Sequence, residues 1–317
     1  MKLKVFLFHR VSPDADLVWP PITPLHFDRI ISHLQKDHEI VPLEQTILGN
    51  YKPSGKKKLC AITFDDGYKD FITHALPVLK KHKAPASMYV ITESVNSGMP
   101  PWTFVLHHTL LGTKHEKLEL KSEEIPTVLR KIKWNDTKEK VHYIKKLSHQ
   151  LKRISNQGRE EVLGQIMAQT TDVRDWQTLM MNWDDIRNIH QEGIEIGSHS
   201  ESHPTLSGNL DLEHLYDELK KSGAEIQQYI DKFPLAISYP FGMYNNDVKN
   251  LAEKAGYKMG LTVLPKKHGI KTNRFEIPRI ELYSEPFWKS KLRLGGQIQL
   301  VKNVLFYDSN SINKALG

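Results

Sequence analysis

Short apolar runs alternate with amphipathic segments along most of the chain. Runs at residues 3–8, 59–64 and 86–91 predict buried strands, and segments at 24–34 and 68–81 predict amphipathic helices between them. The alternation returns after residue 180, with predicted strands at 194–196, 235–239, 257–263 and 277–280 and predicted helices at 182–190, 211–230 and 246–255. Six or seven parallel strands joined by crossover helices fit either a barrel or a doubly wound sheet.

Residues 97–180 interrupt this rhythm with charged, helix-like sequence that contains no clear strand. Candidate helices run through Leu111 and near 122–132, 136–153 and 159–170. We interpret 97–180 as a helical subdomain inserted into a barrel domain of residues 1–285, with a C-terminal helix and tail at 286–317. The insertion could form a lid over a site or a surface for a partner.

The composition excludes several classes of protein. With 317 residues, 39% hydrophobic and 26% charged, the chain is neither collagen-like, disordered nor a coiled coil. The single Cys60 excludes an intramolecular disulfide framework and a Cys-rich zinc module. No apolar run approaches the roughly 20 residues that span a bilayer, and Lys2 and Lys4 interrupt the first residues too early for a signal peptide. A cytoplasmic protein is therefore expected.

The charge balance suits an anionic partner. Lys and Arg number 44 and Asp and Glu 37, which gives a net charge of +7. Such a charge fits a phosphate-bearing glycan carrier, a membrane surface or nucleic acid, but no basic stripe or motif for nucleic acid accompanies it. The predicted C-terminal helix, with Lys289, Lys291, Arg293 and Lys302, could touch an anionic membrane weakly or simply present a solvated face.

Two adjacent acids, Asp65 and Asp66, directly follow the predicted strand at 59–64. The carboxyl ends of parallel strands form the edge where α/β active sites lie. Neighbouring carboxylates repel each other, which raises one pKa unless a cation neutralises them. The structural alternative is a turn at Asp66-Gly67, in which Asp66 caps the next helix.

His199 and His203 are four residues apart and follow the predicted strand at 194–196. A chain with 16 histidines produces such pairs by chance, but this pair should emerge at the same sheet edge as the two acids. One Asp and two His can hold Zn²⁺ or a similar ion with positions left open. The ion can lower the pKa of a bound water towards ~7, and a second Asp that is not a ligand can take the proton.

Three segments carry a family resemblance: Thr-Phe-Asp-Asp-Gly at 63–67, His-Ser-Glu-Ser-His at 199–203, and Ser-Tyr-Pro-Phe-Gly at 238–242. In this order they resemble the motifs of the polysaccharide deacetylases of the NodB homology type, carbohydrate esterase family four, and in particular the bacterial surface-polysaccharide branch. The resemblance implies that Asp65 is the general base and that Asp66, His199 and His203 hold the metal.

The resemblance also implies a distorted (β/α) barrel of about seven parallel strands. The expected reaction is metal-dependent removal, most simply with Zn²⁺, of the N-acetyl group of an aminosugar in a bacterial surface glycan or glycan intermediate. The segment Tyr239, Pro240, Phe241 and Gly242 would bind substrate, with the backbone N–H of Phe241 facing the oxyanion.

This sequence departs from the family pattern at two places. Ser238 stands where typical members have an arginine that orients the base, and Arg279 is the predicted substitute. The late Leu-x-x-His motif that carries the catalytic acid is not evident. His268 is one candidate for the acid. His9, which follows the first strand, is the preferred one, although it could instead be a buried structural histidine.

Two other functions stay open for this sequence. The same site could cleave a non-carbohydrate amide, or the two departures could mark a glycan-binding protein with a decayed active site. Trp102, Phe104 and Tyr244 could stack on sugar faces, although packing is the expected role of such aromatic residues. The sequence predicts neither the sugar nor the oligomeric state.

Overall fold

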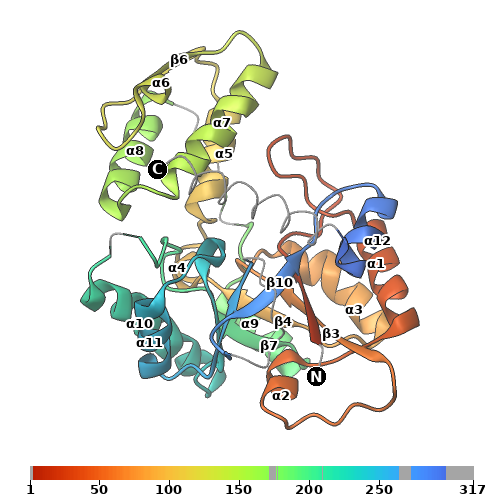
Figure 1. Ribbon diagram of the computed structural model, residues 1–317. Coiled ribbons are helices and arrows are strands. Elements are labelled where there is room, and N and C mark those ends of the chain that lie inside the picture. The colour runs from red at the N-terminus through yellow and green to blue at the C-terminus, as the bar shows by residue number, and fades with distance from the viewer. Residues whose placement is uncertain (1–2, 171–175, 177, 209, 264–272, 298–317) are drawn as a thin grey trace, which may run out of the picture.

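The computed structural model describes residues 3–170, 176, 178–208, 210–263 and 273–297 (Figure 1). Its strands are β1 (Leu3–Phe8), β2 (His38–Ile40), β3 (Lys58–Phe64), β4 (Ser87–Val90), β5 (Lys117–Glu119), β6 (Lys131–Lys133), β7 (Glu195–Ser198), β8 (Ala236–Ser238), β9 (Met259–Thr262) and β10 (Ile277–Glu281). Its helices are α1 (Pro24–Asp37), α2 (Leu43–Ile47), η1 (Phe71–Ala75), α3 (Leu76–His82), α4 (Thr92–Ser97), α5 (Trp102–Gly112), α6 (Thr127–Arg130), α7 (Thr137–Leu151), α8 (Asn156–Gln169), α9 (Trp183–Gln191), α10 (Leu212–Ile230), η2 (Pro240–Gly242), α11 (Asn246–Ala255) and α12 (Phe287–Gly295).

Seven parallel strands close into a barrel. The strands pair in the order β1, β10, β9, β8, β7, β4 and β3, and β3 returns to pair with β1. The short β2 pairs with the beginning of β3 and was not predicted from the sequence. The closed ring confirms the predicted distorted (β/α) barrel and excludes the doubly wound sheet.

Alternation along each strand decides which side chains face the barrel interior. On β1 and β3, Val5 and Ala61 pack in a core that also contains Tyr89 of β4, whereas Phe6 and Ile62 pack against the surrounding helices. The neighbours at every second position therefore point inward as well, towards the carboxyl end of the barrel. The same alternation places the side chains at the carboxyl ends of these strands inside the barrel mouth.

Helix starts follow the capping residues of the sequence. The Thr23 side chain accepts a hydrogen bond from the backbone N–H of His26 at the start of α1, and Asn182 forms a capping box with Asp185 at α9. The predicted helix at 68–81 begins later than expected, because a π-helical turn at Phe71–Ala75 precedes α3.

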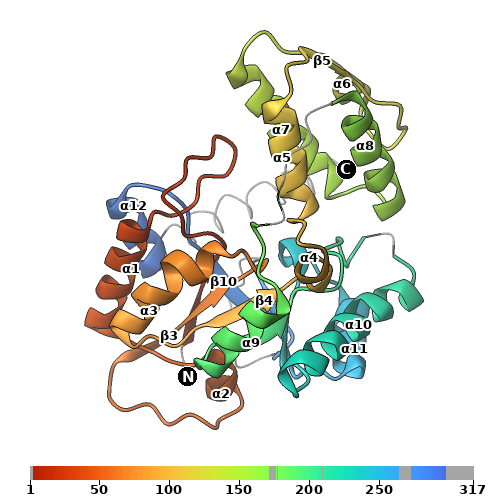
Figure 2. The same ribbon diagram turned by 180° about the vertical axis from the view of Figure 1, so that it is seen from behind.

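The segment from α5 to α8 forms a separate lobe above the barrel mouth, whereas α4 packs beside α10 on the barrel (Figures 1 and 2). Helices α5, α7 and α8 pack around their own apolar core, which includes Leu110, Ile144, Leu147 and Val162. The expectation that this segment lacks strands is wrong, because β5 and β6 form a short antiparallel pair. The only helix in the region 122–132 is the four-residue α6, which leads directly into β6.

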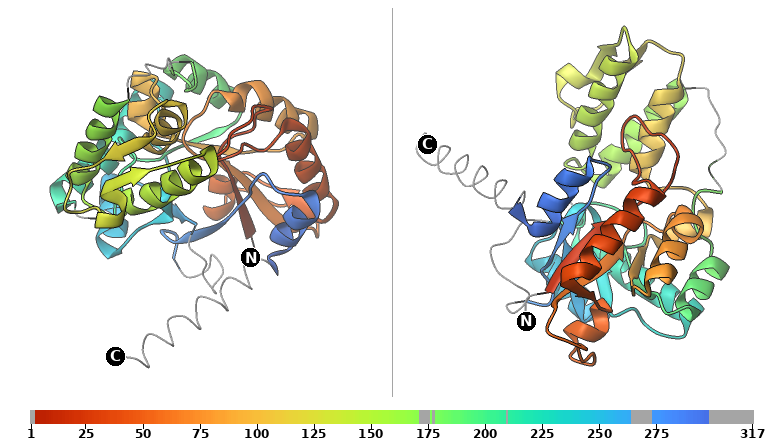
Figure 3. Two further views of the ribbon diagram at one scale, coloured as in Figure 1. Left: turned by 90° about the horizontal axis from the view of Figure 1, so that it is seen from above. Right: turned by 90° about the vertical axis from the view of Figure 1, so that its right-hand side faces the viewer.

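The last described helix, α12, lies beside α1, as the two views of Figure 3 show. Arg293 is buried and pairs with Glu285 at 2.8 Å, so it does not belong to a solvated basic face. Lys302, like His268, lies outside the described residues. Among the described residues, no helix combines the length and the apolar character needed to cross a bilayer.

The packing of the barrel interior can be tested at Gly197 of β7. A Cβ atom there would lie 2.3 Å from two ring carbons of Tyr89 and 3.0 Å from the carbonyl oxygen of Ala236. We expect Gly197→Ala to lower the free energy of unfolding by about 1–3 kcal/mol, the usual cost of overpacking. Gly164→Ala on α8 is the matched control, because a Cβ atom there meets nothing within 4 Å. Urea unfolding that gives both variants the same stability would contradict this packing.

Candidate active site

Asp65 lies at the carboxyl end of β3, inside the barrel. Its carboxylate accepts two hydrogen bonds from Arg279 of β10, Nη1 to Oδ1 and Nη2 to Oδ2, each 2.7 Å long. The Ser238 hydroxyl of β8 donates a third hydrogen bond to Oδ2, at 3.0 Å. Ser238 Oγ also accepts a hydrogen bond from Arg279 Nη2, at 2.7 Å. Three strands therefore fix one carboxylate.

The electrostatic environment keeps Asp65 ionised. Burial opposes the charge, but the positive charge of Arg279 and the neighbouring His199 outweigh it and lower the pKa of Asp65 from 3.8 to about 2. The position that carries arginine in typical family members is Ser238 here, and the guanidinium reaches Asp65 from Arg279 instead. The motif at 238–242 does not by itself show that the guanidinium comes from Arg279.

Asp66, His199 and His203 form a buried cluster whose ligand atoms all lie within 4.8 Å of one another. His199 Nε2 is 3.5 Å and His203 Nε2 is 3.8 Å from Asp66 Oδ1. His199 Nδ1 lies 2.7 Å from the carbonyl oxygen of Ser238. Because a carbonyl only accepts, His199 Nδ1 must carry the proton, and a neutral ring then turns the Nε2 lone pair towards the carboxylates.

This donor set fits a divalent cation. Burial raises the pKa of Asp66, and the adjacent Asp65 raises it further. Burial together with His199 lowers the pKa of His203 well below its usual value, and His203 Nδ1 has no hydrogen-bond partner among the described residues. One carboxylate and two imidazoles are the ligands that Zn²⁺ and similar ions bind.

The backbone at the site is strained. Six described residues other than glycine have a positive φ, and four of them are at or beside the site: Asp66 (75°), Ser200 (67°), His203 (60°) and Phe241 (58°). Such conformations cost roughly 1–3 kcal/mol each and concentrate at functional sites, where the surrounding structure enforces them. No pattern in the sequence predicted these positive φ angles.

The segment at 239–242 contributes its backbone and one aromatic ring. Tyr239 is fully buried, and its hydroxyl donates to the carbonyl oxygen of Phe275. The Phe241 ring packs on His203 with ring centroids 4.6 Å apart. A Cβ atom at Gly242 would lie 2.5 Å from the backbone nitrogen of Val263, so this close approach requires glycine.

His9 follows β1 and lines the same cavity as the residues above. Its Nδ1 atom is 3.7 Å from Glu281 Oε1, and its ring packs edge-on against Trp19 with centroids 4.7 Å apart. His9 remains 17% exposed, so it is not sealed in the core. Glu281 lies two residues beyond Arg279 on β10, and the sequence reasoning did not identify it.

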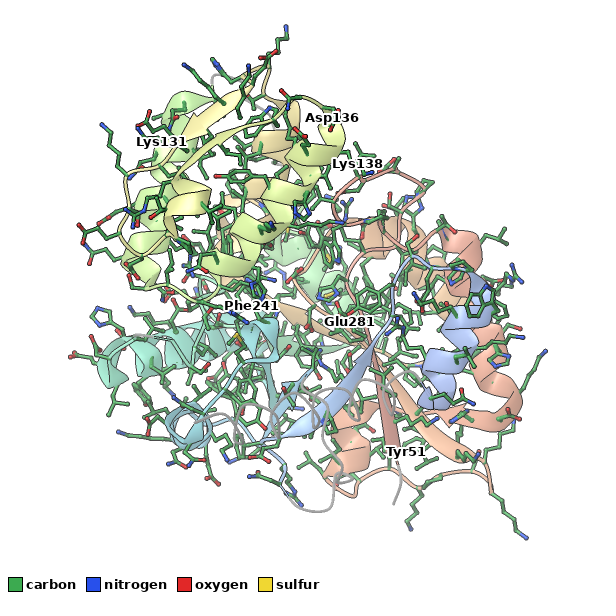
Figure 4. The ribbon with its side chains drawn as sticks, turned by 45° about the horizontal axis from the view of Figure 1, so that its top comes forward. Tyr51, Lys131, Asp136, Lys138, Phe241 and Glu281 are labelled. Atoms are coloured by element: carbon green, nitrogen blue, oxygen red, sulfur yellow. The ribbon has the colours of Figure 1, made fainter. Side chains whose placement is uncertain are left out.

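The cavity has a volume of about 240 Å³, and the lobe above the barrel forms part of its wall. Phe241 and Glu281 lie at the barrel mouth below the lobe in Figure 4. The lobe contributes five lining residues: Phe104, which the sequence offered as a possible sugar-stacking residue, and Thr103, His107, Ser148 and Lys152, which no motif identified. No spacing rule could have found these four, because they reach the site only through the packing of the lobe.

The three aromatic residues that could stack on a sugar are all packed in the structure, and one of them also lines the cavity. Tyr244 stacks on Tyr239 and packs in the core around α11, and Trp102 donates a hydrogen bond from Nε1 to the carbonyl oxygen of His203, at 3.3 Å. Phe104 is 6% exposed, stacks on His108 and lines the cavity. Packing therefore occupies all three, as expected, with Phe104 also facing the cavity.

The fold and this constellation define a hydrolase barrel with a candidate metal centre. The family model described as polysaccharide deacetylase matches residues 52–260, more than half of the chain. The chain belongs to the polysaccharide deacetylase family.

Individual relatives are distant. The protein YxkH of Bacillus subtilis (strain 168), whose name also refers to polysaccharide deacetylases, is 22% identical over 269 residues, which cover 83% of this chain and 65% of YxkH. The Streptococcus pyogenes deacetylase PplD in complex with acetate has a TM-score of 0.57 at 18% identity, covering 90% of this chain and 94% of PplD. IcaB from Ammonifex degensii has a TM-score of 0.59 at 16% identity, covering 91% and 95%. These two structures share the fold.

Arg279→Met tests the buried pair at Asp65. Removing one partner leaves an uncompensated buried carboxylate, so we expect the metal-free protein to lose about 3–5 kcal/mol of stability at pH 7. In the native protein the pair should stabilise the fold above pH 3.8, the ordinary pKa, and lose this contribution as the pH falls towards about 2. Urea unfolding across this range should show that dependence weakened or reversed in Arg279→Met. The exposed Arg274→Met is the control, and equal losses in both variants would refute the interpretation.

Proposed function

We propose that this protein removes the N-acetyl group of an aminosugar in a bacterial surface glycan by metal-dependent hydrolysis, with Zn²⁺ as the ion. One observation carries the proposal. The ionised Asp65, oriented by Arg279, lies beside the Asp66, His199 and His203 cluster without being part of it, with His199 Nε2 3.7 Å from Asp65 Oδ2. The site therefore holds a separate candidate base next to a candidate metal centre.

Each residue has a distinct task in the proposed reaction. A divalent ion held by Asp66, His199 and His203 would polarise the acetyl carbonyl and acidify the attacking water, which lets a base of such low pKa take its proton. Asp65 accepts that proton while Arg279 and Ser238 hold the carboxylate in place. The backbone N–H of Phe241 stabilises the oxyanion.

The leaving amine also requires a proton. His9 lines the cavity, and its Nδ1 atom lies 3.7 Å from Glu281 Oε1. We assign His9 the role of donating a proton to the amine nitrogen as the C–N bond breaks. Acetate and the free amino sugar are then the products.

The missing arginine at 238 no longer supports the hypothesis of a glycan-binding protein with a decayed active site, because Arg279 supplies the guanidinium that the segment at 238–242 lacks. Hydrolysis of a non-carbohydrate amide is separated from the proposal by assaying acetylated sugars beside small acetylated amines. Release of acetate from the small acetylated amines but not from the sugars would contradict the proposed sugar substrate and favour a non-carbohydrate amide.

Asp65→Asn tests the assignment of the base. The amide cannot accept the water's proton, so we expect kcat for acetate release to fall by at least ~100-fold. Zinc content should stay near that of the native protein, because Asp65 is outside the metal cluster. His199→Ala is the contrasting variant and should lose both metal and activity. Full activity in Asp65→Asn, or its loss of metal alongside activity, would contradict the division of roles.

His9→Gln tests the proton donor. We expect kcat on an acetylated aminosugar to fall by about 100-fold, while hydrolysis of 4-nitrophenyl acetate changes little, because its leaving group needs no proton. A structural histidine would affect the two substrates equally when replaced. Parallel kinetics on both substrates, with metal content measured in the same samples, decide between the roles.

A further inference from the structure

The lobe contributes one lysine to the cavity wall. Lys152 directly follows α7, and its carbonyl oxygen accepts a hydrogen bond from Thr205 Oγ1 at 2.9 Å, two residues beyond His203. Its ammonium lies 4.5 Å from the ring centroid of Phe241, the ring that packs on His203. Lys152 therefore lines the cavity that also contains the candidate metal centre, one aromatic ring away from His203.

Among the described residues, the ammonium of Lys152 contacts the Phe241 ring but forms no ion pair, whereas several other charged groups of the cavity are paired. Asp16 Oδ2 is 3.0 Å from His108 Nε2, Asp65 is held by Arg279, and Glu281 lies near His9. Within the described part of the chain, no carboxylate lies within 4.0 Å of Lys152 Nζ and no hydrogen bond from it is formed. Burial lowers the pKa of Lys152, although the more distant charges of Glu281 and Asp66 oppose that shift.

His107 of α5 is a second unsatisfied group on the same wall. Its Nε2 atom is buried and has no hydrogen-bond partner among the described residues. Burial, with a further contribution from the charge of Lys152, lowers the pKa of His107 to about 4. The ring is therefore neutral near pH 7 and can donate one hydrogen bond from Nε2 when the proton is on that atom.

We propose that Lys152 and His107 together bind an anionic substituent, a carboxylate or a phosphate, carried by the sugar whose acetyl group faces Asp65. The inference rests on the proposed function and narrows its substrate class to acidic N-acetylated sugars. An ammonium removed from water gains most from an anionic acceptor, since charge-assisted hydrogen bonds are about twice as strong as neutral ones. The contact with the Phe241 ring leaves the N–H donors of Lys152 available for such a group.

The test compares three substrates that differ in charge: N-acetylglucosamine, its 6-phosphate, and an N-acetylated aminosugar uronic acid. The native protein should have a higher kcat/KM for at least one acidic sugar than for the neutral one. Lys152→Met should lower that preference about tenfold or more, the effect of losing a charged hydrogen bond. Lys152→Arg should restore much of it. Lys146→Met, which removes an exposed lysine from the preceding helix α7, is the matched control and should keep the native preference.

Binding measured without turnover separates this inference from the proposed function. The zinc-loaded Asp65→Asn protein should bind the preferred acidic sugar more tightly than the neutral sugar in calorimetry, and Lys152→Met in that background should abolish the difference. Such a result together with no acetate release by the native protein would refute the proposed reaction and keep the anion site. Equal affinity for all three sugars, or a preference that survives Lys152→Met, overturns the inference.

Discussion

Two neighbouring carboxylates buried at the end of one strand are the constraint on which this structure depends. Asp65 and Asp66 repel each other, and burial adds the cost of desolvating each charge. Arg279 neutralises Asp65 through two hydrogen bonds, whereas Asp66 Oδ1 lies 3.5 Å from His199 Nε2 and 3.8 Å from His203 Nε2. One acid is thus satisfied by the protein itself, and the other lies beside two imidazoles in a cluster whose donor atoms fit a cation.

The closed barrel is what allows this separation of roles. The parallel register places Val5 beside Arg279 and Leu7 beside Thr63, so the inward-facing positions of β1, β3 and β10 meet at one level. The carboxyl ends of β7 and β8 supply the histidine loop and Ser238 at the same edge. The left-handed backbone at Asp66, His203 and Phe241 then turns each side chain into the mouth, at a cost that the packed barrel offsets.

The alternation of strands and helices predicted a parallel α/β fold, and the family resemblance of the three motifs selected the barrel over the doubly wound sheet. The central residues could be predicted because they lie in local patterns. Asp65, Asp66, His199 and His203 directly follow apolar strands, and the ends of parallel strands converge whatever the details of packing. Arg279 could be named as the partner of Asp65 because it lies on the last predicted strand. The structure places its guanidinium on that carboxylate.

The lobe and its contribution to the cavity lay beyond sequence reasoning. Lys152 and His107 are separated from the motifs by long stretches of charged sequence, and only the packing of α5 and α7 over the barrel mouth brings them there. The short strands β2, β5 and β6 have three residues each, too few to show a periodicity. The strained backbone also depends on tertiary contacts, which no residue pattern encodes.

The coordination of zinc in the loaded protein tests the central claim most directly. X-ray absorption at the zinc edge, recorded with one equivalent of Zn²⁺ bound, should show two imidazole nitrogens at about 2.0–2.1 Å and oxygen ligands completing the shell. The account predicts this shell unchanged when Asp65 is replaced by Asn. A shell without imidazole, or the absence of stoichiometric binding, would contradict it.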